Sequence, residues 1–175
     1  RYIQQSGYGT QRVEEEVYRL FPRSRVARLD LDSSNRKGQQ GQILEAMKKG
    51  EIDILIGTQM VAKGLDFPGV SLVGILDADA MLSLPDFRSG ERGFQLLVQA
   101  AGRAGRGPVS GEVIIQTYNP DNQIIQMAAQ QDYLGYYQEE INWRRLLKYP
   151  PFSSLLRVVA ISINETLARN VADMI

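Results

Sequence analysis

The feature that most constrains the fold is an alternation along the chain between short runs that predict strands and longer segments that predict helices. The strand runs are rich in β-branched residues, and the central ones are apolar on both faces, as in parallel sheets covered by helices. They cover residues 25–32, 52–57, 70–79 and 111–118. The helical segments cover residues 9–22, 40–51 and 94–104. This alternation predicts an α/β fold with a doubly wound, mostly parallel sheet.

Two of the helical segments carry end signals. Thr10 is the expected N-cap of the first, because apolar residues at helical spacing follow it and Pro22 stands just past the predicted end. In the second, two lysines lie in the last turn, and Gly50 is placed to terminate the helix. Both helices are therefore predicted with defined limits.

The pattern changes beyond Asn119. Two helices are predicted next, at 121–130 and 132–147, and the prolines of YPPF then interrupt the chain. A strand over 154–164 and a helix over 165–175 follow. We therefore expect an α/β domain over 1–120, a helical connection over 121–150 and the start of a small α+β domain over 151–175.

Composition excludes several kinds of chemistry. The 175 residues contain no cysteine and no histidine, which excludes disulfides, thiolate catalysis and the usual zinc sites within them. Twenty basic and twenty acidic residues cancel, so any nucleic-acid contact must come from a local patch. Without a signal peptide or a membrane-length apolar run, we expect a cytoplasmic protein with no membrane contact. The chain has no initial methionine and ends inside a predicted helix, so we expect a piece of a longer protein.

The first candidate loop, TQMVAKGLDFP, begins at residue 58. Ligands of open α/β sheets bind at the carboxyl ends of strands, and this loop follows a predicted strand. Thr58 can hold a phosphate with its hydroxyl, Gly64 lets the backbone turn tightly, and Asp66 can accept from a ribose hydroxyl. The alternative is that Thr58 caps a turn and Asp66 forms an Asx-turn before Phe67.

The second candidate loop, QAAGRAGRG, covers residues 99–107 and is expected in the same binding crevice. Arg103 and Arg106 stand there among glycines and alanines. Small neighbours let a flat partner approach closely, and two guanidinium groups offer fixed donors to a phosphate or a carboxylate. The alternative is an exposed pair that neutralises a helix C-terminus, which explains neither the glycines nor Gln99.

Both loops resemble motifs of superfamily 2 helicases. GTQMVAKGLDFPGVSLVGILDAD resembles motif V, and QAAGRAGRG is similar to motif VI. The intervening PDFRSGERGFQLLVQ, with GYGTQRVEEEV, RLDLDSS and RRLLKYPPF, resembles the PriA family of replication restart helicases. The resemblance implies a RecA-like lobe 2 of an ATP-dependent DNA helicase that acts in replication fork restart and primosome assembly, followed by the start of a C-terminal domain.

The resemblance also implies site residues. Thr58 would contact the phosphate backbone of the DNA strand, and Lys63 would either contact DNA phosphate or stay solvated. Arg103 and Arg106 would reach the triphosphate on lobe 1 as arginine fingers. The residues at the nucleotide cleft would be Gly64, Asp66 and Gln99.

The cofactors and partners implied lie mainly outside this chain. ATP and Mg²⁺ would be bound mainly by lobe 1, because neither G-x-x-x-x-G-K-[ST] nor an acidic magnesium box is present here. Zinc would belong to the family's upstream cysteine-rich module, with none in this chain. The implied partners are single-stranded and forked DNA, lobe 1 of the same chain, primosome proteins and single-strand-binding proteins. Alone, the chain is expected not to hydrolyse ATP.

Several residues keep two interpretations. Asp77 and Asp79 invite a metal site, but two carboxylates at a strand end are more often turn ligands, so we expect no metal. Ser89 and Gly90 replace alanines of the family pattern, and a glycine weakens a helix start. A salt-bridged face is expected from Arg88, Glu91 and Arg92.

The helix predicted over 132–147 has two interpretations. One is a basic and aromatic nucleic-acid patch formed by Trp143, Arg144, Arg145 and Lys148. We expect instead that this helix packs on a core through Trp143, Leu146 and Leu147.

Two other functions stay open. Another superfamily 2 translocase or an RNA helicase would share motifs V and VI. A non-catalytic nucleic-acid or protein binding module would keep the fold without meeting a catalytic lobe. A phosphate-binding loop upstream in the full-length chain would favour a helicase over the binding module.

Overall fold

The computed structural model of the protein describes residues 9–30, 39–58, 61, 67, 69–105 and 110–174. The chain divides into two compact units, Arg1–Tyr136 (unit 1) and Tyr137–Ile175 (unit 2). This division falls inside one helix, and the domain limits expected at 120 and 150 stay predictions.

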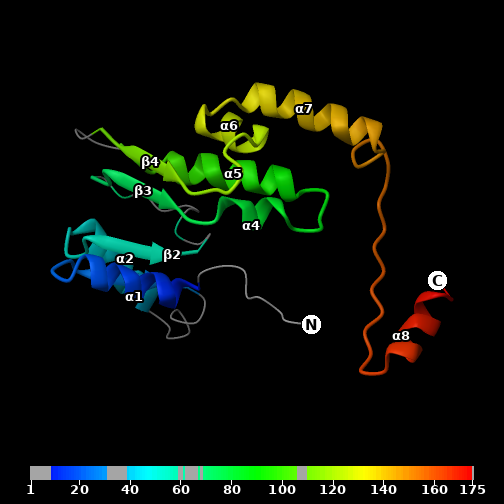
Figure 1. Ribbon diagram of the computed structural model, residues 1–175, viewed down its shortest axis with the longest axis horizontal. Helices are drawn as coiled ribbons and strands as arrows, with labels where there is room; N and C mark the ends of the chain where they lie inside the picture. Colours follow the sequence, from blue (N-terminus) through cyan, green and yellow to red (C-terminus); the bar gives the residue numbers. More distant parts are fainter. Residues whose placement is uncertain are drawn as a thin grey trace. The chain divides into compact units, whose positions relative to one another are not determined.

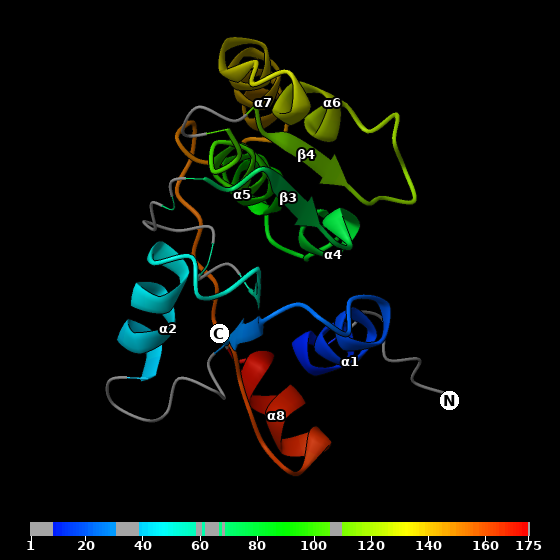
Figure 2. The ribbon, with the colours of Figure 1, turned by 90° about the vertical axis from the view of Figure 1, so that its left-hand side faces the viewer.

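Unit 1 combines two parallel strand pairs with helices (Figures 1 and 2). The pairs are β1 (Val26–Leu29) with β2 (Ile54–Gly57) and β3 (Leu72–Ile75) with β4 (Glu112–Ile115). Its described helices are α1 (Thr10–Leu20), α2 (Gln39–Lys48), α4 (Ala78–Leu82), α5 (Ser89–Ala101), α6 (Gln123–Ala129) and the start of α7 (Tyr133–Leu146). The predicted α/β class is confirmed. The described strands form two two-stranded sheets, so a single doubly wound sheet stays a prediction.

The N-terminal end of α1 differs from the prediction. Gly9 precedes the helix, and Thr10 is its first helical residue. The Thr10 hydroxyl donates a 2.6 Å hydrogen bond to a carboxylate oxygen of Asp30, just past β1. The N-cap prediction for Thr10 is wrong, because a partner distant in sequence takes its hydroxyl.

The C-terminal end of α2 is as predicted. Gly50 has a left-handed φ of +69°, which glycine adopts without a steric penalty. The amide of Glu51 donates back to the carbonyl of Ala46 over 2.9 Å, in the pattern that closes many helices. The glycine therefore ends α2 and directs the chain toward β2.

A buried core packs against β3 and β4. Phe94 stacks on Tyr136, with ring centroids 4.2 Å apart and planes 7° from parallel. Ile75 of β3 and Ile115 of β4 pack against this core. The buried cluster consists of Ala78, Phe94, Leu97, Ile125, Ala128 and Tyr136.

Helices α4 and α5 differ in extent from the prediction. The sequence predicted no separate helix at α4, and α5 begins at Ser89 and ends at Ala101 instead of covering 94–104. Gly90 lies in the first turn of α5, so this departure from the family pattern does not prevent a helix start. A Cβ atom on Gly93 would lie 2.4 Å from Cδ2 of Leu82, so glycine permits the close approach of α4 and α5.

Unit 2 contains the second part of α7 and α8 (Glu165–Ala172). Asn164 caps α8 by accepting a 3.2 Å hydrogen bond from the amide of Leu167. The strand predicted over 154–164 is wrong for the described chain, since no strand is formed there. An apolar extended segment becomes a strand only when its backbone pairs with another one. Within the ranges given above, no helix is long and apolar enough to cross a membrane.

The second part of α7 does not pack on a core as expected. Trp143, Leu146 and Leu147 are 58%, 71% and 54% exposed. The prediction that these three side chains are core residues is therefore wrong.

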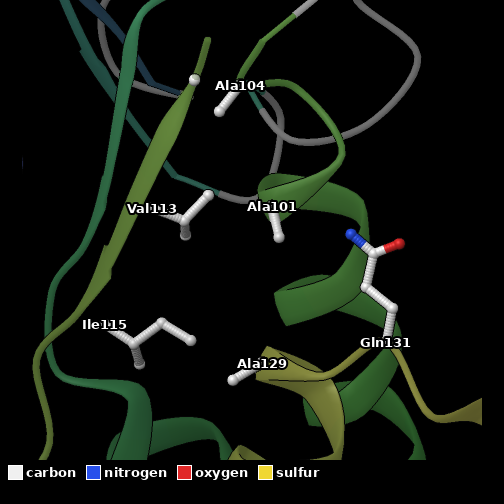
Figure 3. A pocket seen from close by; sticks show the side chains of 7 residues that line it. Ala101, Ala104, Val113, Ile115, Ala129 and Gln131 are labelled. Carbon is white, nitrogen blue, oxygen red and sulfur yellow. The ribbon is translucent and has the colours of Figure 1, made fainter.

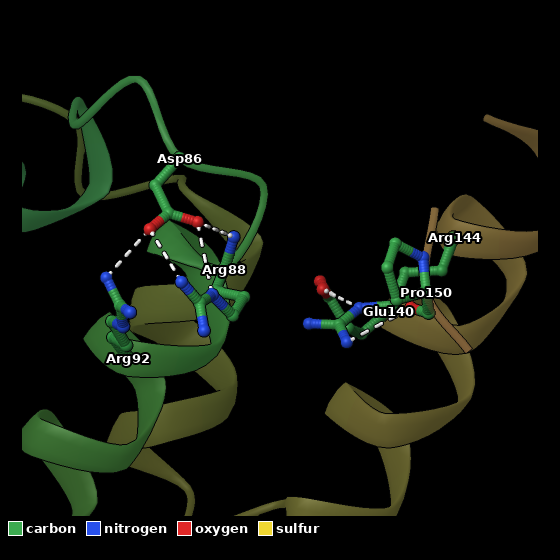
Figure 4. Close-up of polar contacts among 6 residues, drawn as sticks. All are labelled: Asp86, Arg88, Arg92, Glu140, Arg144 and Pro150. Carbon is green, nitrogen blue, oxygen red and sulfur yellow. Dashed lines mark hydrogen bonds and ion pairs between the residues drawn. The ribbon is translucent and has the colours of Figure 1, made fainter. Parts of the chain in front are cut away.

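Two basic residues of the same helix have partners inside unit 2. Nε of Arg144 donates to Glu140 over 2.7 Å (Figure 4). The Arg145 guanidinium lies 5.0 Å from the ring centroid of Phe152. Both arginines thus have partners within unit 2, and the nucleic-acid patch stays a prediction.

Candidate functional site

Thr58 lies at the carboxyl end of β2, as predicted. β1 and β2 pair in register up to Leu29 and Gly57, so the chain leaves the pair at Thr58. Thr58 is exposed, and its carbonyl accepts a 3.0 Å hydrogen bond from the amide of Val61. The backbone turn is what the turn-capping alternative requires, and the exposure is what a phosphate contact requires.

Gly57 keeps this turn close to β1. A Cβ atom on Gly57 would lie 2.6 Å from the carbonyl oxygen of Leu29 and 2.2 Å from Cγ2 of Val61. No side chain fits at these distances, so only glycine permits this backbone spacing. Gly57, the residue just before Thr58, is therefore packed directly on the last residue of β1.

The arginine turn, residues 102–105, follows α5. The amide of Arg103 donates to the carbonyl of Ala100 over 3.0 Å, and that of Ala104 to Ala101 over 3.2 Å. Arg103 is half-buried and Gln99 is exposed. The helix thus ends in a tight turn that carries Arg103.

Gly105 joins the arginine turn to the chain just past the first loop. Its φ is +73°, and its amide donates to the carbonyl of Val70 over 3.0 Å. A Cβ atom on Gly111 would lie 2.0 Å from the Gly105 nitrogen, so the chain entering β4 touches the same point. The structure therefore brings the arginine turn of the second candidate loop against Val70, two residues past the first.

The arginine turn lies at the opposite edge of its strand pair from the one expected. Val70 comes before β3 and Gly111 comes before β4, so the turn lies at the amino ends of these strands. A helix that connects two parallel strands returns the chain to the amino end of the next strand. The last turn of α5 therefore cannot lie at the carboxyl edge of the β3–β4 pair, and that expectation is wrong.

Four predicted site residues lie outside the described residues: Lys63, Gly64, Asp66 and Arg106. Their roles stay predictions. The chain just after Asp66 is anchored, because Phe67 is only 6% exposed. Gly69 then turns with a φ of +90° before Val70.

A cavity of about 240 Å³ lies behind the arginine turn (Figure 3). Ala101 and Ala104 come from the end of α5 and the turn, and Val113 and Ile115 come from β4. None of the seven described residues that line it carries a charged side chain that could neutralise a phosphate. We therefore assign no part of the nucleotide site to this cavity.

Asp79 is a turn ligand. Its Oδ1 accepts from the Thr117 hydroxyl over 2.9 Å, and its Oδ2 accepts from the amide of Tyr118 over 2.8 Å. The Tyr118 amide, together with the Thr117 hydroxyl, lowers the pKa of Asp79 below its ordinary value. Asp79 thereby ties α4 to the chain that leaves β4. Across the described ranges, no three His, Cys, Asp or Glu side chains gather so that they could hold a metal ion.

Asp86 pairs with both arginines at the start of α5 (Figure 4). It accepts from the amide of Arg88 over 2.9 Å and from Nη1 of Arg92 over 2.8 Å. The Arg88 amide and side chain lower the pKa of Asp86 below its ordinary value. The two arginines of the predicted face therefore form their ion pairs with Asp86, which the prediction did not include, while Glu91 accepts from Gln95 over 3.2 Å.

Sequence reasoning missed Asp30 and the bond between Gly105 and Val70. Asp30 is a charged residue that is only 5% exposed. Its signal in the sequence is a carboxylate directly after an apolar strand. The signal for the bond is a glycine on each side of residues 106–110, which permits a close backbone contact.

Comparison with known proteins shows the family to which this chain belongs. Residues 8–108 match the family described as the helicase conserved C-terminal domain. This match includes the first candidate loop and the second, with both arginines.

Curated relatives extend the likeness along nearly the whole chain. The replication restart protein PriA of Bacillus subtilis is 51% identical over 164 residues, which is 94% of this chain and 20% of that protein. PriA of Synechocystis is 44% identical over 94% of this chain and 20% of its own length. PriA of Treponema pallidum is 46% identical over 95% of this chain and 25% of its own length. The chain thus spans a fifth to a quarter of these relatives, and it belongs to the helicase conserved C-terminal domain family, as a superfamily 2 helicase C-terminal lobe that resembles PriA.

Proposed function

We propose that this chain is lobe 2 of an ATP-dependent DNA helicase that acts in replication fork restart and primosome assembly. The observation that carries the proposal is the hydrogen bond between Gly105 and Val70, which joins the arginine turn to the chain just past the first loop. The relatives' name, replication restart protein PriA, supports the process.

In this proposal, Arg103 and Arg106 face the phosphates of ATP bound mainly on lobe 1. A guanidinium beside a transferring phosphoryl group stabilises the negative charge that develops there. Bound Mg²⁺ supplies further neutralisation of the phosphates, and we assign its ligands to lobe 1. Zinc is assigned to an upstream module. Gly64, Asp66 and Gln99 line the nucleotide cleft.

Thr58 contacts a phosphate of the DNA single strand in this proposal, and Lys63 adds a second contact. The chain that leaves Thr58 through the first loop reaches Val70 two residues past the loop, and the Val70 carbonyl accepts from Gly105 of the arginine turn. One stretch of the chain therefore connects the DNA contact to the arginine turn. This connection couples ATP hydrolysis to movement along DNA. Forked DNA, primosome proteins and single-strand-binding proteins are the expected partners.

The test is DNA-stimulated ATP hydrolysis by a full-length protein that carries this chain. Arg106→Ala and Arg103→Ala should each lower the rate by about 10³-fold. Arg106→Lys should restore little, because a lysine is a point charge without the planar fork. Arg92→Ala is the matched control, since Arg92 is 53% exposed on α5, the helix that precedes the arginine turn, and pairs with Asp86. Its rate should stay within about twofold of the unmodified protein.

Other outcomes would separate the alternatives. Unchanged hydrolysis in both arginine variants would indicate that the two arginines only neutralise the C-terminal end of a helix. DNA binding without any ATP hydrolysis would indicate a non-catalytic module. Hydrolysis stimulated by RNA in place of DNA would indicate an RNA helicase.

A further inference from the structure

A polar cluster joins α1 to β1, and the proposed function does not use it. Thr10 and Glu14 contribute from α1, four residues apart on one face of the helix. Arg28 of β1 and Asp30 just past it contribute from the strand side, two residues apart on one face.

Asp30 is the centre of this polar cluster. Its Oδ2 accepts from the Thr10 hydroxyl over 2.6 Å and from Nη1 of Arg28 over 2.5 Å. Nε of Arg28 lies 2.9 Å from a carboxylate oxygen of Glu14. A buried carboxylate is costly without partners, and hydrogen bonds to charged groups have strict geometry. The polar cluster therefore fixes the backbone of Asp30.

The polar cluster is also what orients α1. None of the residues of α1 is fully buried, and its half-buried residues include Val13 and Val17 as well as Thr10 and Glu14. Apolar contacts are non-directional, whereas this set of hydrogen bonds defines one arrangement. The start of α1 is thereby fixed to the carboxyl edge of β1.

Asp30 and Thr58 leave the same edge of one strand pair. Leu29 pairs with Gly57, so Asp30 and Thr58 are the next residues along the two parallel strands. Gly57 lies so close to the Leu29 carbonyl that a Cβ atom would be 2.6 Å from it. A shift of the backbone at Asp30 therefore displaces the turn that begins at Thr58.

We propose that Asp30, held by Thr10 and Arg28, is a positioning residue that sets the place of Thr58 for binding a DNA phosphate. The proposal rests on the proposed function, in which Thr58 contacts the DNA strand. Arg28 has a second role, since its positive charge offsets the repulsion between the Asp30 carboxylate and a phosphate at Thr58.

The test is a double-mutant cycle on single-stranded DNA affinity in a full-length protein that carries this chain. Asp30→Ala and Thr58→Ala should each weaken binding about ten- to hundredfold, the size expected for a hydrogen bond to a charged group. The double variant should bind about as weakly as either single variant, because both changes remove the same contact. Effects that multiply would overturn the inference.

Asp53→Ala is the matched control. Asp53 pairs with Arg25 over 2.6 Å at the amino edge of the same strands, so its loss removes the same kind of pair far from Thr58. DNA affinity should be unchanged in this variant. Equal weakening by Asp53→Ala and Asp30→Ala would show general destabilisation and overturn the inference.

A conservative variant separates position from folding. Asp30→Asn keeps the volume and an oxygen acceptor, so it should restore most of the DNA affinity. Hydrogen exchange at the amide of Val61, which bonds to the Thr58 carbonyl, should be faster in Asp30→Ala and normal in Asp30→Asn. Unchanged affinity in Asp30→Ala, with weakened binding in Thr58→Ala, would overturn the positioning role alone. Unchanged affinity in Thr58→Ala would overturn the DNA contact of the proposed function, and the positioning role with it.

Discussion

The two strand pairs of unit 1 are held to their helices by different forces. Beside β1 and β2, α1 half-buries Val13 and Val17 and is attached in addition by charged and hydroxyl groups. Beside β3 and β4, the helices bury a cluster in which Phe94 stacks on Tyr136. Apolar burial stabilises in proportion to area, whereas paired charges contribute geometry more than net free energy. Both halves bury apolar side chains, with Leu29 and Ile56 buried in the β1–β2 half, and the β1–β2 half adds a set of paired charges that orients α1.

The largest effect should come from Phe94→Ala. This change removes a side chain that is 2% exposed and leaves a cavity, which typically costs about 3–5 kcal/mol. Native-state hydrogen exchange of α5 and β3 amides in the full-length protein would measure the loss of free energy of unfolding. Tyr118→Ala is the control, because Tyr118 is 91% exposed. A similar loss in both variants would contradict the assignment of stability to the core.

An intermediate effect is expected from Gly111→Ala. The new Cβ atom would lie 2.0 Å from the nitrogen of Gly105, so the backbone has to move. We expect a loss of about 1–3 kcal/mol in the free energy of unfolding. DNA-stimulated ATP hydrolysis should fall too, because the arginine turn is displaced. Gly74→Ala on β3 is the control, since its Cβ would meet nothing within 4 Å. Normal hydrolysis by Gly111→Ala would show that the turn tolerates the shift.

The smallest effect concerns pH in the β1–β2 half. The Arg25 side chain and amide hold the pKa of Asp53 well below its usual range. A depressed folded-state pKa contributes stability above the unfolded value of about 3.9, and this contribution is lost as pH falls toward the folded value. The protection factors of β1 and β2 amides, which are corrected for the intrinsic exchange rate at each pH, should therefore fall as pH drops below about 4. In Asp53→Asn this part of the pH dependence should disappear. An unchanged acid profile in that variant would show that the Arg25–Asp53 pair adds no stability.

Local signals explain which elements were predictable. The limits of α2 followed from apolar spacing and from Gly50, which the structure shows in a left-handed conformation. The partner of Thr10 was not predictable, because Asp30 is brought to it by the packing of α1 on β1. The strand expected over 154–164 shows the converse case, since apolar composition alone does not supply a partner backbone.

The candidate site was predictable only where local sequence signals determine it. Thr58 follows β2 as expected, and Arg103 follows α5. The edge at which the arginine turn lies depends on the path of the connection, and the motif alone does not contain that information. The bond between Gly105 and Val70 likewise joins segments that are distant in sequence, so it emerges only from the fold.

Gly105 and Gly111 meet backbone to backbone, so the residues between them belong to a loop whose ends are already closed. Lengthening a closed loop adds little entropy cost, about 0.6 kcal/mol for each doubling of its length. Residues can therefore be inserted or deleted after Arg106 and before Gly111 without displacing Arg103. The contact between the two glycines keeps the turn constant while this stretch of the chain varies in length.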